Sequence, residues 1–167
     1  MNNFEFTIRP AKLGDADKIS ELLDEVAAEY IYIMSEPGER TADHIKALLH
    51  KKFTNRNLFL VVDNYGYIVG VLGFIGGAFK KISHVAEIGM AIDKQFRSSG
   101  LGSTLLREAV AWSRKKGFLR LELGVLSTNK KALSLYKKFG FQEEGVRKNR
   151  YQVDGEWVDE ILMAKFL

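Results

Sequence analysis

The stretch Arg97-Ser98-Ser99-Gly100-Leu101-Gly102 decides how the middle of the chain folds. It follows the apolar stretch Val85–Ile92 and opens an apolar-periodic stretch at Leu101, an order that predicts a strand, a loop and a helix. The glycines at 100 and 102 leave no Cβ between an anion and the backbone, and the unpaired N–H groups of the first helical turn point toward that anion. The junction therefore predicts a site for a phosphate-bearing cofactor.

Two common nucleotide-binding loops fit this stretch poorly. A dinucleotide-binding loop needs a third glycine where the chain has Leu105, and a P-loop ends in Gly-Lys-Ser/Thr where the chain has Gly102-Ser103-Thr104. An unrelated protein that binds ATP or NAD is thus a competing interpretation that these residues disfavour.

The rest of the chain predicts an α+β fold in the order β-α-α-β-β-β-α-β-α-β-β. We expect strands at 4–9, 58–62, 68–75, 85–92, 119–125, 147–153 and 157–166, and helices near 15–30, 41–53, 101–116 and 129–139. Asp15, Thr41 and Asn129 are the expected N-caps of three of these helices. A strand-helix-strand crossover around 85–125 predicts one parallel pair within a mixed central sheet.

Composition excludes several function classes. The 167 residues suit one domain, and 46% hydrophobic with 28% charged residues is ordinary for a soluble globule. The absence of cysteine excludes disulfides, Cys-ligated zinc and an enzyme thiol nucleophile. The net charge of +4 comes without interleaved aromatics, which disfavours nucleic acid as a partner. With no apolar run near 18 residues, and with Glu5 and Arg9 in place of a signal peptide's apolar core, we expect a cytoplasmic protein without a membrane partner.

Three segments together resemble one family. The spacing Arg97-x-x-Gly100-x-Gly102 resembles the acyl-CoA pyrophosphate loop of the GNAT family of N-acetyltransferases. A later segment resembles the family's second conserved stretch through Asn129, Ala132, Leu135-Tyr136 and Phe139-Gly140-Phe141. The ending looks like the closing hairpin of the ribosomal-protein alanine and spermidine acetyltransferase branches, through Gly145, Arg147, Tyr151, Trp157-Val158-Asp159 and Met163. The resemblance implies a single N-acetyltransferase domain at 6–167, with a GNAT-like sheet whose parallel strands splay apart.

The resemblance also implies acetyl-CoA as co-substrate, without a metal. The pantetheine arm would lie between the splayed strands against the backbone of Ala91 and Ile92, and the Met90 N–H would face the thioester carbonyl. The residues implied around the pyrophosphate are Arg97, Ser98, Ser99, Gly100, Leu101, Gly102, Ser103 and Thr104. Alternatives remain for several of these residues: Met90 can be plain core, Arg97 can be solvated, and the hydroxyls of Ser103 and Thr104 can bond only to backbone.

Tyr136 is the candidate general acid. The matching tyrosine in the family lies beside the cofactor sulfur, where a phenol can protonate the departing thiolate. The alternative is a core aromatic with its hydroxyl satisfied. Asn129 can cap its helix whether or not it also contacts pantetheine.

Glu87 is the candidate general base. Strand alternation points it away from Ile88 and Met90, so this role is easier if Gly89 marks a β-bulge. A surface salt bridge is the alternative. His84 is the next candidate, whereas His44 and His50 suit surface or capping roles, and no His, Asp or Glu cluster has metal-ligand spacing.

The acceptor is expected near the end of the first helix and the loop after it. Glu29, Tyr30 and Tyr32 form an acidic and aromatic set that suits a cationic amine, with a solvated loop as the alternative. The resulting hypothesis is direct acetyl transfer, within a ternary complex, to a primary amine: a small amine, an amino-acid analogue or a protein N-terminus. A non-catalytic acetyl-CoA-binding module is the alternative, and the closing hairpin offers an edge for a possible homodimer.

Overall fold

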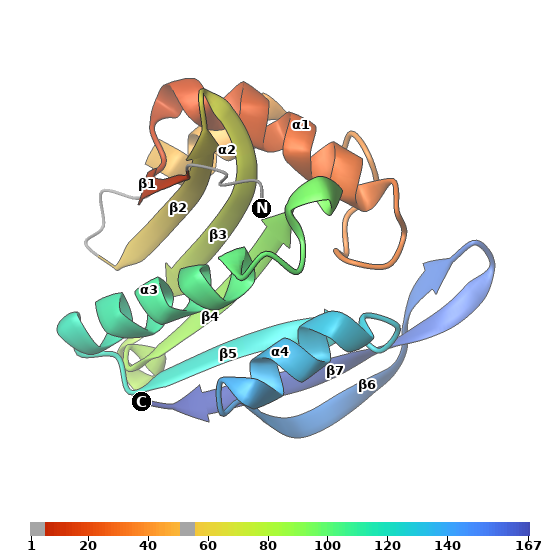
Figure 1. Cartoon of the computed structure of the whole chain (residues 1–167). Helices are drawn as coiled ribbons and strands as arrows, with labels where there is room; N and C mark the ends of the chain where they lie inside the picture. Colours follow the sequence, from red (N-terminus) through yellow and green to blue (C-terminus); the bar gives the residue numbers. More distant parts are fainter. Residues whose placement is uncertain (1–5, 51–55) are drawn as a thin grey trace.

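The computed structural model describes residues 6–50 and 56–167, which build one seven-stranded sheet in the order β1-β2-β3-β4-β5-β7-β6 (Figure 1). The elements along the chain are β1 (Thr7–Pro10), η1 (Leu13–Asp15), α1 (Ala16–Ala27), α2 (Ala42–His50), β2 (Asn57–Asn64), β3 (Tyr67–Gly76), η3 (Lys80–Ile82), β4 (Val85–Ile92), η4 (Lys94–Phe96), α3 (Leu101–Lys115), β5 (Arg120–Leu126), α4 (Lys130–Lys138), β6 (Gln142–Val153) and β7 (Glu156–Phe166). The predicted α+β fold and its order of strands and α-helices are confirmed.

Some predicted boundaries are wrong. Helix α1 ends at Ala27, because the chain turns away before Tyr30, whose φ of 54° is left-handed. Strand β6 begins at Gln142, five residues before the predicted start. The positions 4 and 53, predicted to belong to a strand and a helix, lie outside the described residues.

Two of the three expected N-caps are confirmed. Thr41 Oγ1 accepts from the His44 N–H at 3.3 Å, and Asn129 Oδ1 accepts from the Ala132 N–H at 3.1 Å. Asp15 occupies the N-cap position of α1, as predicted, but its side chain makes no capping bond to that helix. Its carboxylate binds Arg9 instead, a partner that helix periodicity cannot reveal.

The helices cover the two faces of the sheet with separate cores (Figure 1). On one face, α3 and α4 pack onto the middle strands, where Leu105, Leu106 and Leu121 are fully buried. On the other face, α1 and α2 pack onto the first strands, around Ile19 and Val61. Strand β6 forms an edge of the sheet, so the edge needed for a homodimer is present, while the dimer itself stays a prediction.

The parallel strands β4 and β5 pair over only three positions. Val85 pairs with Arg120, Ala86 with Leu121 and Glu87 with Glu122. Beyond Glu87, β4 continues beside β3 as far as Ile92, and β5 continues beside β7 as far as Leu126 (Figure 1). We call the opening between residues 88–92 of β4 and 123–126 of β5 the fork, and it corresponds to the predicted splay.

The direction of the peptide groups in the fork follows from the ends of β4. The Asp93 N–H donates to Val69 O of β3 at 3.0 Å, and at the other end Val85 O accepts from the Gly77 N–H at 2.8 Å. Odd-numbered residues of β4 therefore face β3, since peptide directions alternate along a strand and the register with β3 has no shift. The N–H groups of Met90 and Ile92 consequently point into the fork.

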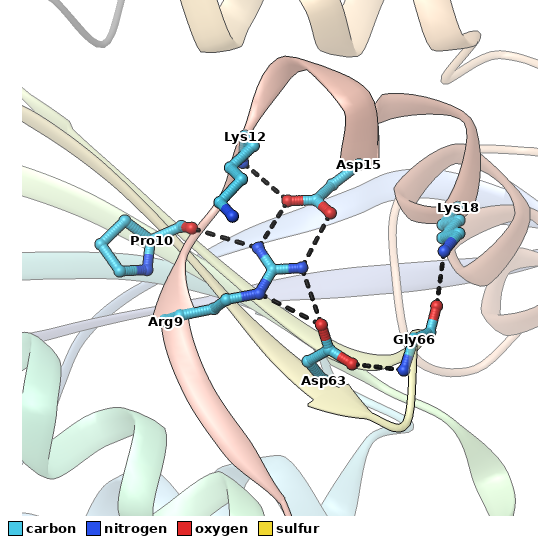
Figure 2. Close-up of polar contacts among 7 residues, drawn as sticks. All are labelled: Arg9, Pro10, Lys12, Asp15, Lys18, Asp63 and Gly66. Carbon is cyan, nitrogen blue, oxygen red and sulfur yellow. Dashed lines mark hydrogen bonds and ion pairs between the residues drawn. The ribbon is translucent and has the colours of Figure 1, made fainter.

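An ion-pair network fixes the start of the chain to the sheet (Figure 2). The Arg9 guanidinium donates to both Asp15 oxygens, at 2.7 and 2.9 Å, and to Asp63 Oδ2 at 2.8 Å. Asp15 also accepts from the Lys12 N–H, and Asp63 from the Gly66 N–H. The network joins β1, the turn before α1 and the β2–β3 turn. Within the described residues, no helix is long and apolar enough to cross a membrane.

Replacing Arg9 should destabilise the fold in a pH-dependent way. Hydrogen bonds from Arg9 hold the pKa of Asp15 and of Asp63 below their ordinary value of 3.8, so their stabilisation is present above that pH and is lost as pH falls through the folded-state pKa. We expect Arg9→Gln to lower the free energy of unfolding by about 1–3 kcal/mol at pH 7 and to flatten the loss of stability on acidification. Urea unfolding at pH 7 and pH 3 measures both effects.

The control for this prediction is Lys46→Gln, which removes a 3.6 Å pair with the exposed Asp43 and should change stability by less than about 0.5 kcal/mol. Equal acid dependence of the wild type and Arg9→Gln would show that the network does not carry the pH effect.

Candidate active site

The loop before α3 presents a row of unpaired backbone amides. Ser98 and Gly100 have positive φ angles of 62° and 92°, which turn the chain from η4 into the helix. The first helical bond runs from the Thr104 N–H to Gly100 O at 3.0 Å. Among the described residues, no hydrogen-bond acceptor is found for the amides of residues 100–103. These amides and the positive end of the helix dipole suit an anion.

The two glycines of the loop serve different purposes. At Gly100 a Cβ would meet nothing within 4 Å, but its φ of 92° favours glycine. At Gly102 a Cβ would lie 3.0 Å from Leu135 Cδ2 and 3.4 Å from Ile92 Cδ1. Gly102 therefore lets α3 approach α4 and the end of β4, a packing role that the sequence analysis did not separate from anion binding.

Side chains of the loop bond mostly to backbone. Thr104 Oγ1 donates to Gly100 O at 3.2 Å, and Ser99 Oγ donates to Phe96 O at 2.5 Å. For Thr104 this matches the alternative in which the hydroxyl serves the helix. The implied contacts of residues 98–104 with a pyrophosphate thus depend on backbone amides more than on hydroxyls.

Arg97 joins the loop to the segment after α1 instead of turning toward the free amides. Its guanidinium donates to both Glu29 oxygens, at 2.9 and 2.5 Å, and lies 4.0 Å from the centre of the Tyr32 ring. Its Nε donates to Ile92 O at 2.8 Å. The hydrogen bonds from Arg97 lower the pKa of Glu29, so this carboxylate is ionised and already paired.

This pairing changes the electrostatics expected on the acceptor side. From the sequence, Glu29 and Tyr32 are expected beside a cationic acceptor and Arg97 beside the cofactor, but the structure places the three side chains against one another. Tyr30 stands apart from them, 42% exposed, and lines a small cavity described below.

The backbone N–H groups at the end of β4 point in alternating directions. The Met90 and Ile92 N–H groups point into the fork, whereas Ala91 faces β3, beside Val71. Alternation turns the Ala91 N–H toward β3, so a contact of Ala91 with the cofactor stays a prediction that cannot use this N–H. The Met90 side chain packs against the core between the sheet, α3 and α4.

Tyr136 lies on α4 in the same core. It is 6% exposed, and its ring packs edge-on against Phe141 with centroids 5.6 Å apart. Burial raises the pKa of Tyr136 to about 12, so the phenol keeps its proton at neutral pH. The hydroxyl has no hydrogen-bond partner in the described part of the chain, which leaves its proton free for a ligand.

Asn129 connects α4 to the segment after α1. Besides capping α4, its Nδ2 lies 3.5 Å from Tyr32 O. Asn129 is 6% exposed. The capping interpretation is confirmed, and the implied contact with pantetheine stays a prediction.

Glu87 lies at the closed end of the fork. The expected bulge at Gly89 is wrong, since β3 and β4 pair without a register shift from Gly76–Ala86 to Gly70–Ile92. The Glu87 side chain therefore lies on the opposite face of the sheet from Ile88. It is beside Glu122, on the face that α1 and α2 cover. Its side chain is exposed, as a proton acceptor in contact with solvent would be.

The histidines are poorly placed for catalysis. His84 precedes β4 at the closed end, about 20 Å from Met90 at the usual rise per strand residue. His44 and His50 are exposed on α2. Across residues 6–50 and 56–167, no group of three His, Asp or Glu side chains could hold a metal ion.

A second cluster was missed from the sequence. Glu160 of β7 is 4% exposed and accepts from Arg147 Nη1 at 2.8 Å, while the Tyr151 hydroxyl lies 3.2 Å from its Oε1. A Cβ at Gly124, in the fork, would overlap with the same Oε1. The sequence did offer one indication, since strand alternation puts the acidic Glu160 on the same face as the apolar Val158 and Leu162.

The segment after α1 closes a small cavity against the β6–β7 hairpin. The cavity has a volume of about 60 Å³, and its lining includes Tyr30, Met34, Ser35, Leu126 and Tyr151. The Ser35 hydroxyl is buried there without a hydrogen-bond partner. Figure 1 shows the loop after α1 and the hairpin tip on the same side of the molecule.

Known proteins share this sequence and fold. Residues 20–141 match the family model described as Acetyltransferase (GNAT) family. The chain is 30% identical over 166 residues to the L-amino acid N-acetyltransferase AaaT of Escherichia coli, covering 96% of this chain and 98% of that protein. It is 36% identical over 105 residues to a Bacillus subtilis protein named as a [ribosomal protein bS18]-alanine N-acetyltransferase, covering 63% and 66%.

A solved structure shares the whole fold. The yncA structure from Salmonella typhimurium, which contains its cofactor acetyl-CoA, superimposes with a TM-score of 0.87 at 21% identity, covering 97% of this chain and 94% of that one. The family match covers most of the chain, including the loop before α3, the fork and all of α4. The chain therefore belongs to the GNAT family of acetyltransferases and catalyses acetyl-CoA-dependent N-acetyl transfer.

Proposed function

We propose that the chain transfers acetyl directly from acetyl-CoA to a primary amine, with the thioester lying in the fork. The observation that carries this proposal is the loss of β4–β5 pairing after Glu87, which leaves the Met90 and Ile92 amides pointing into an opening beside free loop amides. Holding both reactants together supplies much of the rate, since oriented groups reach effective molarities of order 10⁵ M.

The cofactor would bind through backbone. The amides of residues 100–103 receive the pyrophosphate, and the Ile92 N–H pairs with pantetheine like an added strand. Ile92 O already accepts from Arg97 Nε, which leaves one of its two lone pairs for a second donor. Asn129 and Tyr136 flank the same arm from α4 in this proposal.

The thioester carbonyl would receive the Met90 N–H. A fixed donor aimed at a developing oxyanion contributes about 3 kcal/mol to lowering a barrier. The amine nitrogen forms a bond to the acetyl carbon, and the carbon–sulfur bond breaks. Before the attack, Glu87 takes a proton from the acceptor's ammonium through water. Tyr136 protonates the leaving thiolate. The nitrogen then loses a second proton, which restores the Tyr136 phenol.

The acceptor class is an α-amino group in this proposal. The named activities of the relatives support it, since one acts on L-amino acids and another is named for an alanine of a ribosomal protein. We also propose that residues 6–167 form a single domain, that the protein is cytoplasmic, and that it has no nucleic-acid or membrane partner.

Thiol release with a chromogenic disulfide tests the reaction, and the chain itself contributes no thiol. We expect acetyl-CoA-dependent release with α-amino acids or short peptides. Tyr136→Phe should lower kcat by roughly 10²- to 10³-fold, because the general acid is lost, while acetyl-CoA binds as before. Steady-state rates and calorimetric titration with acetyl-CoA measure the two effects.

The matched control is Tyr67→Phe, which removes a 75%-exposed phenol from the β2–β3 hairpin and should leave kcat unchanged. Acetyl-CoA binding without release across amino acids, peptides and polyamines would instead favour the non-catalytic module. Full activity of Tyr136→Phe would exclude that residue as the acid.

Arg97 and Glu29 should act as one unit in catalysis. Removing either charge leaves the other partly buried and unpaired, at 14% and 23% side-chain exposure, and frees the segment that carries Tyr32. A double-mutant cycle with Arg97→Gln and Glu29→Gln should give a coupling free energy of about 1–2 kcal/mol in kcat/KM for the amine.

Arg40→Gln, in the same segment, provides a control that should not couple to Arg97. Additive effects would contradict the proposed unit. If Arg97→Gln lowered only the affinity for acetyl-CoA and Glu29→Gln had no effect, Arg97 would act only as a ligand of the cofactor.

A further inference from the structure

A buried carboxylate lies beside the fork with no role in the reaction described above. The Glu160 side chain is 5% exposed, and Glu160 pairs with Leu126 of β5 on one side of β7 and with Arg147 of β6 on the other. Only Gly124 allows its Oε1 to approach β5 so closely, because a Cβ there would overlap with that oxygen. A buried charge is costly unless it is paired, so the partners of Glu160 indicate its purpose.

The partners of Glu160 form an excess of positive charge. Arg147 donates to Oε2 at 2.8 Å, and Arg150 Nε lies 4.0 Å from the same oxygen. Both arginine side chains are 55% exposed, so each keeps guanidinium donors that face outward. Burial and the Glu160 carboxylate raise the pKa of Tyr151, which therefore remains a neutral donor. One carboxylate with two arginines leaves a net charge of +1.

An irregularity of β6 brings these groups together. The pairing of β6 with β7 shifts between Arg147 and Tyr151, and Asn149 has a φ of 50° inside the shift. The shift puts Arg147 and Arg150 on the same carboxylate although they are three residues apart. Lys148, inside the same shift, is instead bound to Asp159 at 2.8 Å.

The segment after α1 forms the other wall of this region and contributes neutral groups and one acidic side chain, Glu36, which lines the adjoining cavity. Met34 Sδ lies 2.7 Å from the Tyr151 hydroxyl, and the Ser35 hydroxyl is buried without a partner in the adjoining cavity. Glu29, the acidic residue expected to attract a cationic acceptor, is bound to Arg97. At Arg147, Arg150 and Glu160 themselves the local charge is positive, while Glu36 is the acidic group of the adjoining cavity.

We propose that Arg147 and Arg150 bind a carboxylate carried by the acceptor beside its reacting amine, and that Glu160 positions the two guanidinium groups. This inference rests on the proposed function and narrows its substrate class to free α-amino acids and analogues with the same carboxylate. Glu160 lies between Arg147 and Gly124, because its Oε2 accepts from Arg147 and its Oε1 would overlap with a Cβ at Gly124, so the Arg147 guanidinium lies near the β5 side of the fork.

Guanidinium chemistry supports this assignment. Arginine has five donors in a planar fork that matches a carboxylate, and Arg147 uses Nη1 on Glu160. A second ammonium, as in a polyamine, would meet like charge. An α-amide, as in a peptide, would lack the charge that the site is built to receive, and its neutral group would form weaker hydrogen bonds.

The experiment compares each L-amino acid with its own α-amide, which keeps the amine and side chain and lacks the carboxylate. We expect the wild type to prefer the acid in kcat/KM by roughly 10- to 100-fold, the range for hydrogen bonds to charged groups. Arg147→Gln and Arg150→Gln should each reduce this preference severalfold or more, with the acetyl-CoA KM unchanged.

Glu160→Gln tests the positioning role. It should reduce the acid-over-amide preference while leaving kcat/KM for the amide near the wild-type value, whereas a purely structural role would lower thermal stability and leave the preference intact. Lys148→Gln removes the same charge from the same part of β6 and should keep the wild-type preference.

Inhibition of the wild type by reaction products gives an answer even if a variant does not fold. The N-acetyl amino acid should inhibit more strongly than the N-acetyl amino amide. Equal use of acids and amides by the wild type, or an unchanged preference in both arginine variants, would overturn the inference and leave the proposed function standing. No turnover with any amine, despite acetyl-CoA binding, would overturn both.

Discussion

The missing hydrogen bonds between β4 and β5 are the constraint on which the rest of the site depends. Both strands keep their outer partners along their full length, β3 on one side and β7 on the other, and they part only from each other. A strand edge with unpaired N–H groups in the middle of a sheet would be unstable if buried without a partner. An extended ligand that pairs with this edge resolves the problem, and pantetheine is such a ligand.

In the proposed reaction, the two faces of the sheet bind the two substrates. On one face, α3 begins with free amides and packs through Gly102 against α4 and the end of β4. On the other face, the segment after α1 approaches the β6–β7 hairpin around Glu160 and Tyr151. Arg97 connects the two faces, because it follows the fork and binds Glu29 and Ile92 O. The loop before α3 and the segment after α1 are thereby held in one arrangement.

Local sequence patterns predicted the elements well and their long-range partners poorly. Alternation located β4 with the right ends, and the caps at Thr41 and Asn129 are local chemistry. Asp15 failed as a cap because Arg9 competes for its carboxylate. The Arg97–Glu29 pair joins residues 68 positions apart, and no periodicity predicts such a contact.

The acceptor side was the hardest part of the site to predict. Glu29 is acidic in the sequence, but its charge is neutralised by Arg97 in the fold, and the positive cluster around Glu160 depends on a strand irregularity and on a glycine of another strand. Both effects arise only when distant strands are paired. The pairing of these charges therefore follows from tertiary structure, which a local sequence pattern does not reveal.

Amide hydrogen exchange, followed residue by residue with and without acetyl-CoA, tests the central claim most directly. The account predicts that the Met90 and Ile92 amides, and those of residues 100–103, exchange at least about tenfold more slowly with acetyl-CoA bound, while the amide of Ala86 at the closed end of the fork stays unchanged. Unchanged exchange at Met90 and Ile92 under saturating acetyl-CoA would contradict the claim that the cofactor lies in the fork.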